Sequence, residues 1–419
     1  MDEKHERKLR RQAVRLRLQG LGPSAILKRI PRSRSWLYKW STRYEEVGWA
    51  GLRSQSRRPR RSPQQYSRRE RQHVIWARRA LEKRKVGLIG AAVVQEELRQ
   101  RRVLRRIPSA TTIKRILREA RPVKRLPVAP PQVSYPWPTA CDKYVLYAMD
   151  WTARYLHGGA KVFAFHSIDL ETHVIHQTIS TNKNGETVHR HVLETLQTLG
   201  FPHGLQMDND AAFCGGYKVP RVFGQLVRLC LYLGIEPIFI PVAEPQRNGR
   251  VEFVNQLWSR SFWKRRRFRS VAHVQRACPE FDTWYSQHYK PPALNGQTPA
   301  QAALACQARR QRLRSQQRRV LPKHLPISAG RVHFIRRVSA QGQIDILNET
   351  WFVGKRLAQQ YVWATIVTHE RRLNIYHRRS SQTSARLVKA SRYAIPETVA
   401  PVRSEFKRAG RRRKMSTML

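Results

Sequence analysis

Residues 205–213 read LQMDNDAAF, and this stretch decides how the central part of the chain is interpreted. Two apolar residues with Gln206 between them run into Asp208 and Asp210, in a chain that uses few carboxylates. The pattern predicts a short buried strand at 205–207 that ends in an acidic turn. Burying a carboxylate is costly unless it is paired or bound, so the other acidic residues of this region become relevant.

The segments around this stretch alternate between strand and helix patterns. Strand-like runs lie at 144–151, 161–169, 173–180, 205–207 and 235–241, and helical patterns at 186–199, at 222–233 and from about Gly249 onward. The predicted order is βββαβαβα, which is typical of an α/β domain, here placed at 140–304.

Three acidic residues of this domain stand at the boundaries of predicted elements. Asp150 ends the first strand, Asp208 ends the fourth, and Glu252 lies in the first turns of the last helix. Ends of central strands and starts of adjacent helices meet at one edge of such a sheet. Three converging carboxylates would repel one another, and divalent cations such as Mg²⁺ or Mn²⁺ would relieve the repulsion. Any one of them alone is more often a capping or surface residue, but their joint placement favours a metal site for phosphoryl transfer.

Several motifs resemble one family. MDNDAAF (207–213) stands where that family has Asp-Asn-Gly-x-x-Phe, PQRNGRVE (245–252) resembles its Pro, Asn-Gly and final Glu, and WYSQHYKPPALNGQTPAQAA (284–303) resembles its closing stretch. The span 144–304 thus resembles the catalytic core of DDE transposases and retroviral integrases, of the ribonuclease H-like superfamily. The resemblance implies that Asp150, Asp208 and Glu252 are the catalytic and metal-binding residues and that two Mg²⁺ or Mn²⁺ ions are bound.

The chain departs from the family pattern at Asp210, where the family has Gly. Asp tolerates a left-handed turn better than most residues, so Asp210 is predicted to be a turn residue rather than a contact to the metals. Asp169 is predicted to pair with a base or to cap a turn. Asn255, one turn beyond Glu252, is expected at the same cleft, and Arg247 and Arg250 are candidate contacts to DNA phosphates.

The first 120 residues have helical periodicity. In residues 1–60, Ser24 is a candidate cap of one short helix, and Ser33 or Ser35 of the next. This pair reads as a helix-turn-helix whose Arg32, Arg34 and Lys39 lie toward a DNA groove, although an ordinary helical hairpin has the same pattern. Residues 61–120, with Ser109 as a candidate cap, are predicted to be a second helical DNA-binding domain or, equally, a plain packing unit.

The remaining segments are assigned by composition. Residues 121–139 are rich in Pro and predict an extended linker. Residues 305–325 are a basic helical linker, 326–400 hold short alternating strands that suggest a small closed β-barrel, and 401–419 form a basic tail expected to be disordered.

The charge of the whole chain favours a nucleic-acid partner. Lys and Arg number 81 against 28 Asp and Glu, for a net charge of +53, so a polyanion is needed to screen the self-repulsion. A hydrophobic fraction of 41% argues against a ribosomal-type protein held together by bulk charge. Five scattered cysteines suit reduced thiols, and the charged N-terminus is unlike a signal peptide. These features predict a cytoplasmic, nucleoid-associated protein.

The sequence therefore predicts a multidomain protein with N-terminal all-α helix-turn-helix modules, a central α/β ribonuclease H-like domain and a C-terminal small β-barrel. Its expected function is that of a DNA transposase catalysing metal-dependent 3′-end cleavage and strand transfer of a mobile element. Expected partners are double-stranded DNA, further copies of the chain and, as an open question, an ATPase helper protein. The alternative is a catalytically silent helix-turn-helix DNA-binding protein derived from a transposase. A ribonuclease H-type nuclease would have no use for the flanking DNA-binding regions.

Overall fold

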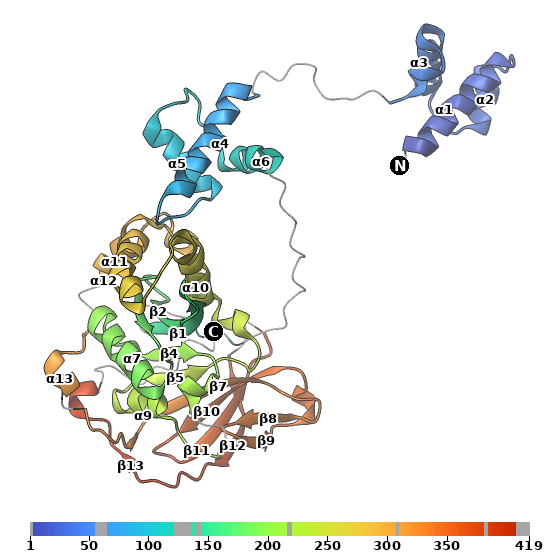
Figure 1. Cartoon of the computed structure of the whole chain (residues 1–419). Helices are drawn as coiled ribbons and strands as arrows, with labels where there is room; N and C mark the ends of the chain where they lie inside the picture. The colour runs from blue at the N-terminus through green and yellow to red at the C-terminus, as the bar shows by residue number, and fades with distance from the viewer. Residues whose placement is uncertain are drawn as a thin grey trace. The chain divides into compact units, whose positions relative to one another are not determined.

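The computed structural model describes residues 3–54, 65–120, 136, 138, 144–215, 220–306, 310–319, 321–380 and 384–407. The chain divides into two compact units, Met1–Arg69 and Glu70–Leu419 (Figure 1). The Pro-rich linker predicted at 121–139 lies almost entirely outside the described residues, as do Cys141 and most of the tail at 401–419.

The first unit is a small helical domain. It contains α1 (Glu3–Leu18), α2 (Pro23–Arg29), α3 (Arg34–Val47) and the 3₁₀ helix η1 (Gly48–Leu52). Ala13, Ile26 and Leu37 come from the three α-helices, and all are fully buried in one cluster. The predicted cap at Ser33 is confirmed, since its hydroxyl accepts from the Trp36 N–H at 3.2 Å. The cap predicted at Ser24 is wrong. That residue lies inside α2, which begins with Pro23, whose fixed φ suits a first helical position.

Three further helices begin the second unit. They are α4 (Arg68–Lys83), α5 (Ala91–Arg101) and α6 (Ala110–Ala120), and they share a core of their own. Ser109 caps α6, since its Oγ accepts from the Thr112 N–H at 3.3 Å. The guanidinium of Arg265 donates to the carbonyl oxygens of Leu81 at 3.0 Å and Arg84 at 2.8 Å, which ties the end of α4 to the α/β region.

The central region has the predicted order βββαβαβα, with a short extra helix, α8. Its elements are β1 (Leu146–Tyr155), β2 (Lys161–Asp169), β3 (Ile175–Ser180), α7 (Gly185–Leu199), β4 (Gly204–Met207), α8 (Ala211–Cys214), α9 (Gln225–Tyr232), β5 (Glu236–Phe239), α10 (Gly249–Ser261), α11 (Val271–His288) and α12 (Pro299–Cys306). Strands β1, β2 and β3 form an antiparallel meander, whereas β4 runs parallel to β1 and β5 parallel to β4. The first strand was expected to end at Asp150 but continues to Tyr155, because it stays paired with β2 along its whole length.

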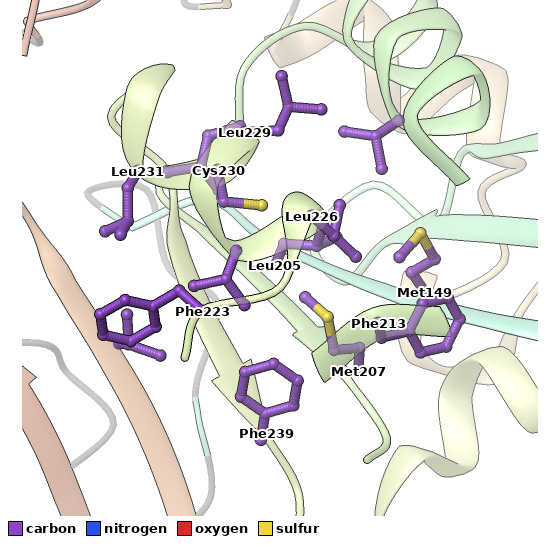
Figure 2. Packing of buried hydrophobic residues seen from close by; sticks show 14 of the residues in the cluster. Met149, Leu205, Met207, Phe213, Phe223, Leu226, Leu229, Cys230, Leu231 and Phe239 are labelled. Carbon is purple, nitrogen blue, oxygen red and sulfur yellow. The ribbon is translucent and has the colours of Figure 1, made fainter. Parts of the chain in front are cut away.

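Alternation along the strands separates two cores. Met149 on β1 and Met207 on β4 face α7 and α9, where they pack with Phe213, Phe239 and other buried residues (Figure 2). Ala148 points to the opposite face and packs under α10 and α11. Because side chains alternate along a strand, Asp150 shares the face of Ala148.

The separate C-terminal β-barrel is not confirmed. The region holds α13 (Ser315–Arg319) and the strands β6 (Ile327–Ser328), β7 (Arg331–Arg337), β8 (Gln343–Ile346), β9 (Glu349–Phe352), β10 (Tyr361–Val367), β11 (Arg372–His377), β12 (Arg386–Arg392) and β13 (Val399–Ala400). Strand β7 pairs in parallel with β5, so four of these strands extend the central sheet into nine, in the order β12-β11-β10-β7-β5-β4-β1-β2-β3 (Figure 1). The rings of Phe239 on β5 and Phe334 on β7 stack with their centroids 5.1 Å apart.

Two other C-terminal predictions need correction. The basic linker predicted at 305–325 is helical only in part, because its described residues hold the end of α12 and the short helix α13 and no other helix. Arg310, in the same segment, forms ion pairs with Asp169 and Glu171. Residues 404–406 form a short 3₁₀ helix rather than a disordered start of the tail, because Phe406 is buried against Phe201 and Tyr232. Among the described residues, no helix combines the length and the apolar character needed to cross a membrane.

Candidate active site

Asp150 lies in a half-buried position on the face of the sheet covered by α10. Its Oδ1 accepts from the Trp151 N–H at 2.7 Å, and its Oδ2 accepts from the Asn255 amide at 2.8 Å. Burial and the charges of Asp208 and Glu252 together raise the pKa of Asp150 to about 7. Both carboxylates are therefore near enough to oppose its ionisation, although they come from another strand and from a helix.

Asp208 follows β4, as predicted, and Met207 before it is buried in the core (Figure 2). Its Oδ1 accepts from the Asp210 N–H at 3.0 Å. Burial raises the pKa of Asp208, and the charge of Asp210 adds to the effect, while the Asp210 N–H and the Lys183 ammonium oppose it. Glu252 lies in the first turn of α10, and its pKa is also raised by burial.

Gln206 and Asn248 join the three elements that carry these carboxylates. The Gln206 amide donates to Oδ1 of Asn248 at 3.0 Å, and the Asn248 amide donates to the carbonyl oxygen of Met149 at 3.0 Å. Both side chains are 2% exposed. Gln206, the polar residue of the run LQM, therefore connects β4 through Asn248 at the start of α10 to β1. This connection fixes the position of Glu252 on α10 relative to Asp150 on β1.

The three carboxylates gather in one region without meeting in a metal-binding geometry. Within the described ranges, no group of three or more His, Cys, Asp or Glu side chains is arranged to hold a metal ion. The arrangement offers carboxylate oxygens only, which are the hard ligands that Mg²⁺ and Mn²⁺ prefer.

Asp210 is a helix cap. Its side chain accepts from the Ala212 N–H at 2.9 Å at the start of α8, and it pairs with the Lys183 ammonium at 2.8 Å. Its φ is −58°, so the left-handed turn expected at this position is absent. Asp169 has both roles predicted for it, because it accepts from the Glu171 N–H and the Thr172 hydroxyl and pairs with Arg310.

The candidate DNA-binding cations differ in their surroundings. Arg247 is 6% exposed and is held by Glu244 at 2.9 Å and the Tyr361 hydroxyl at 3.3 Å, so it is directed into the protein and not toward a ligand. Arg250, on the first turn of α10, is exposed. In the first unit, Arg32 pairs with Glu6 at 2.5 Å, whereas Arg34 and Lys39 on α3 are exposed.

Sequence reasoning missed a contact from the C-terminal region to the acidic turn. Arg336 on β7 donates to Oδ1 of Asn209, the residue after Asp208, at 2.7 Å. It also donates to the carbonyl oxygen of Ile240 at 3.0 Å, and Asn209 donates to the same oxygen at 2.6 Å. No periodicity in the sequence indicates this contact, since it depends on the pairing of β7 with β5.

Two parts of the chain match models of known protein families. Residues 233–299, which include Glu252, match the family model described as integrase core domain, and residues 10–72 match that described as winged helix-turn helix. No curated protein matches the chain.

Similar solved structures include three from retroviruses. The HTLV-2 integrase catalytic core domain in complex with magnesium, in its dimeric form, is 15% identical over 38% of this chain and 94% of that chain, with a TM-score of 0.29. The catalytic core domain of BIV integrase is 17% identical over 39% and 95%, with a TM-score of 0.28. A simian T-cell lymphotropic virus intasome in complex with PP2A regulatory subunit B56 gamma is 14% identical over 74% and 96%, with a TM-score of 0.31. Two parts of the chain thus match family models, a winged helix-turn-helix at 10–72 and an integrase core domain at 233–299, and both are modules of the kind that its motifs resemble.

Proposed function

We propose that this protein is a DNA transposase that cleaves the 3′ ends of a mobile element and joins them to target DNA by DDE chemistry. The observation that carries the proposal is the convergence of three acidic side chains within the integrase-like part of the chain. Asp150, Asp208 and Glu252 come from two strands and a helix, and the charges of the last two raise the pKa of the first.

The donor set fits divalent cations. All three groups are half-buried carboxylates whose pKa values are raised, so without a counter-charge they resist ionising together. Asp150, Asp208 and Glu252 would hold the Mg²⁺ or Mn²⁺ ions, two in number by analogy with the family. When bound, these ions would neutralise the charge that develops on the phosphate oxygens.

The protein's own groups hold this site in place. The Trp151 N–H and the Asn255 amide each bind one oxygen of Asp150, so its carboxylate is oriented before any ligand arrives. The exposed Arg250, two residues before Glu252, is positioned to contact a DNA phosphate. Arg247 is not part of this proposal, because its guanidinium is committed to Glu244 and Tyr361.

The proposed reaction has two balanced steps. First, a water oxygen bonds to phosphorus at the element end while the bond to the 3′ oxygen breaks, which releases a 3′-hydroxyl. Second, the oxygen of that hydroxyl bonds to a target phosphorus while the target's own P–O3′ bond breaks. One P–O bond forms for each that breaks, so neither step needs an external energy source.

The N-terminal unit is proposed to recognise the element ends. Its α3, capped by Ser33, presents the exposed Arg34 and Lys39. We assign the groove contacts to these two residues and leave Arg32 as a structural ion pair with Glu6. Joining two ends in one event needs two active sites, so an assembly of at least two copies on double-stranded DNA is proposed. No match supports the ATPase helper, and association with the nucleoid stays a prediction.

Neutral isosteres test the chemistry. We expect the rates of cleavage and joining to fall by roughly three orders of magnitude or more in each of the variants Asp150→Asn, Asp208→Asn and Glu252→Gln. Binding to the element ends should stay near wild type. The assay is cleavage of labelled duplexes cut from the DNA that flanks the gene, with Mg²⁺ or Mn²⁺, and with Ca²⁺ as a control expected to permit binding but little turnover.

Asp210→Asn is the matched comparison, because it makes the same change two residues away on the helix cap. Full activity in all three carboxylate variants would refute the mechanism and favour the catalytically silent DNA-binding protein. Activity in Asp208→Asn with loss in Asp210→Asn would show that the other aspartate is the functional one.

A further inference from the structure

A row of polar side chains crosses the sheet on the face covered by α10 and α11. In the register of the strands, Asp150 on β1 lies opposite His166 on β2, and His166 lies opposite Gln177 on β3. Directly paired residues of antiparallel strands project from the same face with Cβ atoms about 4.5–5.5 Å apart. The three side chains therefore form a line from the candidate active site toward the edge strand β3.

Hydrogen bonds hold both ends of this row. At the inner end, the Asn255 amide nitrogen donates to Oδ2 of Asp150 at 2.8 Å. At the outer end, the Gln177 amide nitrogen donates to Oδ1 of Asp282 on α11 at 2.6 Å and to the carbonyl oxygen of Cys278 at 3.3 Å. Both amides thus direct their nitrogen away from His166.

The middle of the row contains polar atoms that lack partners. Within the described residues, both ring nitrogens of His166, Oδ1 of Asn255 and Oε1 of Gln177 are buried and accept or donate no hydrogen bond. His166 is 0% exposed, and its ring packs edge-on against Trp258 at 5.5 Å. Leaving such atoms unpaired is costly, and the single N–H of a neutral imidazole can donate to one of the two amide oxygens.

Asn255 and Gln177 are the polar neighbours of the ring. Burial lowers the pKa of His166 to about 4, while the Asn255 and Gln177 side chains act to raise it. The ring is therefore neutral near pH 7 and carries one N–H. Asn255 is its natural acceptor. The amide of Asn255 has only two orientations, and the reversed one would set its oxygen against the carboxylate of Asp150.

We propose that His166 is a positioning residue of the candidate active site: its ring N–H donates to Oδ1 of Asn255 and thereby keeps the Asn255 amide nitrogen on Asp150. Gln177, anchored by Asp282, lies on the other side of the ring. The inference rests on the proposed function, since its consequence is an Asp150 carboxylate held ready for a divalent cation.

His166→Phe is the direct test, because it keeps the ring and its contact with Trp258 but removes both nitrogens. We expect the Mg²⁺ concentration for half-maximal cleavage, and the Kd for Mn²⁺ measured by calorimetry on the full-length protein, to rise about tenfold, as for the loss of one hydrogen bond. The melting temperature should change little, since the variant loses one hydrogen bond but also removes the unpaired second ring nitrogen. A purely structural role for His166 would predict a lower melting temperature and an unchanged metal requirement.

His191→Phe is the matched control. His191 is also 0% exposed, but it lies on the opposite face and bonds to Ser167 at 2.8 Å and Thr178 at 2.9 Å. This variant should lower the melting temperature and leave the metal requirement unchanged.

A double-mutant cycle completes the test. Asn255→Leu should raise the metal requirement by itself, and adding His166→Phe to it should change nothing further, because His166 acts through Asn255. The inference would be overturned, while the proposed function stands, if His166→Phe left the Mg²⁺ concentration for half-maximal cleavage unchanged. Additive increases of that concentration in the double variant would overturn it as well. A wild-type protein that neither binds Mn²⁺ nor cleaves DNA would overturn both.

Discussion

Arg336 provides the sharpest prediction about how the C-terminal strands support the candidate site. Its side chain is 7% exposed and donates to four acceptors: Oδ1 of Asn209 at 2.7 Å and the carbonyl oxygens of Asp345 at 2.9 Å, Ile240 at 3.0 Å and Ile335 at 3.0 Å. Arg336→Met keeps most of the aliphatic stem and removes every donor. The Ile240 oxygen retains the Asn209 amide as a donor, whereas the other three acceptors lose this charged donor.

The expected size of the effect follows from these contacts. Hydrogen bonds from a charged donor contribute about 1.5–3 kcal/mol each, so the free energy of unfolding should fall by about 3 kcal/mol. At roughly 2–4 °C per kcal/mol, the melting temperature should drop by about 6–12 °C. Because Asn209 directly follows Asp208, a shift of this turn by about 1 Å should also slow cleavage by about a hundredfold.

The matched control is Arg337→Met, the exposed next residue on the same strand. Urea unfolding and cleavage of a labelled duplex, both measured on the full-length protein, should separate the two variants, with Arg337→Met close to wild type. Equal losses in both variants, or a destabilised Arg336→Met that cleaves at the wild-type rate, would refute the assignment.

Further predictions concern pH, DNA binding and the acidic turn. Because burial lowers the pKa of His166 from 6.5 to about 4, the unfolded chain takes up the proton first, and about 3 kcal/mol of stability present above pH 6.5 should be lost as the pH falls to 4. Urea unfolding at several pH values checks this, and His166→Phe should remove that component. Replacing Arg34 and Lys39 by Ala should weaken end binding and reduce its salt dependence, whereas Arg32→Ala should mainly lower the stability of the N-terminal unit. Gel-shift titrations and thermal unfolding distinguish these effects, and equal loss of affinity in both would contradict the assignment. Asp210→Gly should retain cleavage, because Gly at a helix N-cap costs only a few tenths of a kcal/mol relative to Asp, and an inactive variant would give Asp210 a larger role.

The central domain is predicted well from sequence because its signals are local. The strand predicted at 161–169 is Lys161–Asp169 in the structure, and the helix predicted at 186–199 is Gly185–Leu199. In both, apolar periodicity and burial agree. The end of β4 and the start of α10 were predicted correctly as well, so the expectation that Asp208 and Glu252 lie near one another rested on correct element boundaries.

The parts that escaped prediction depend on contacts between distant segments. Alternation in 326–400 indicates strands but does not specify which edge they pair with, so a closed barrel and an extension of the central sheet look alike in sequence. Arg247 is a candidate phosphate contact in the sequence, yet Tyr361, more than a hundred residues away, helps to bury it. His166 carries no local signal, since its role follows from strand register.

The pairing of β7 with β5 bears on how this protein can be divided for experiments. A fragment that stops at residue 304 would retain Asp150, Asp208 and Glu252 but would uncover the edge of β5, where Ile238 and Phe239 now pair with His333 and Phe334. Exposed apolar edge strands recruit other chains. Such a fragment should be prone to self-association through the β5 edge. The segment up to residue 304 is consequently not an independent domain that can be exchanged between relatives without the C-terminal strands.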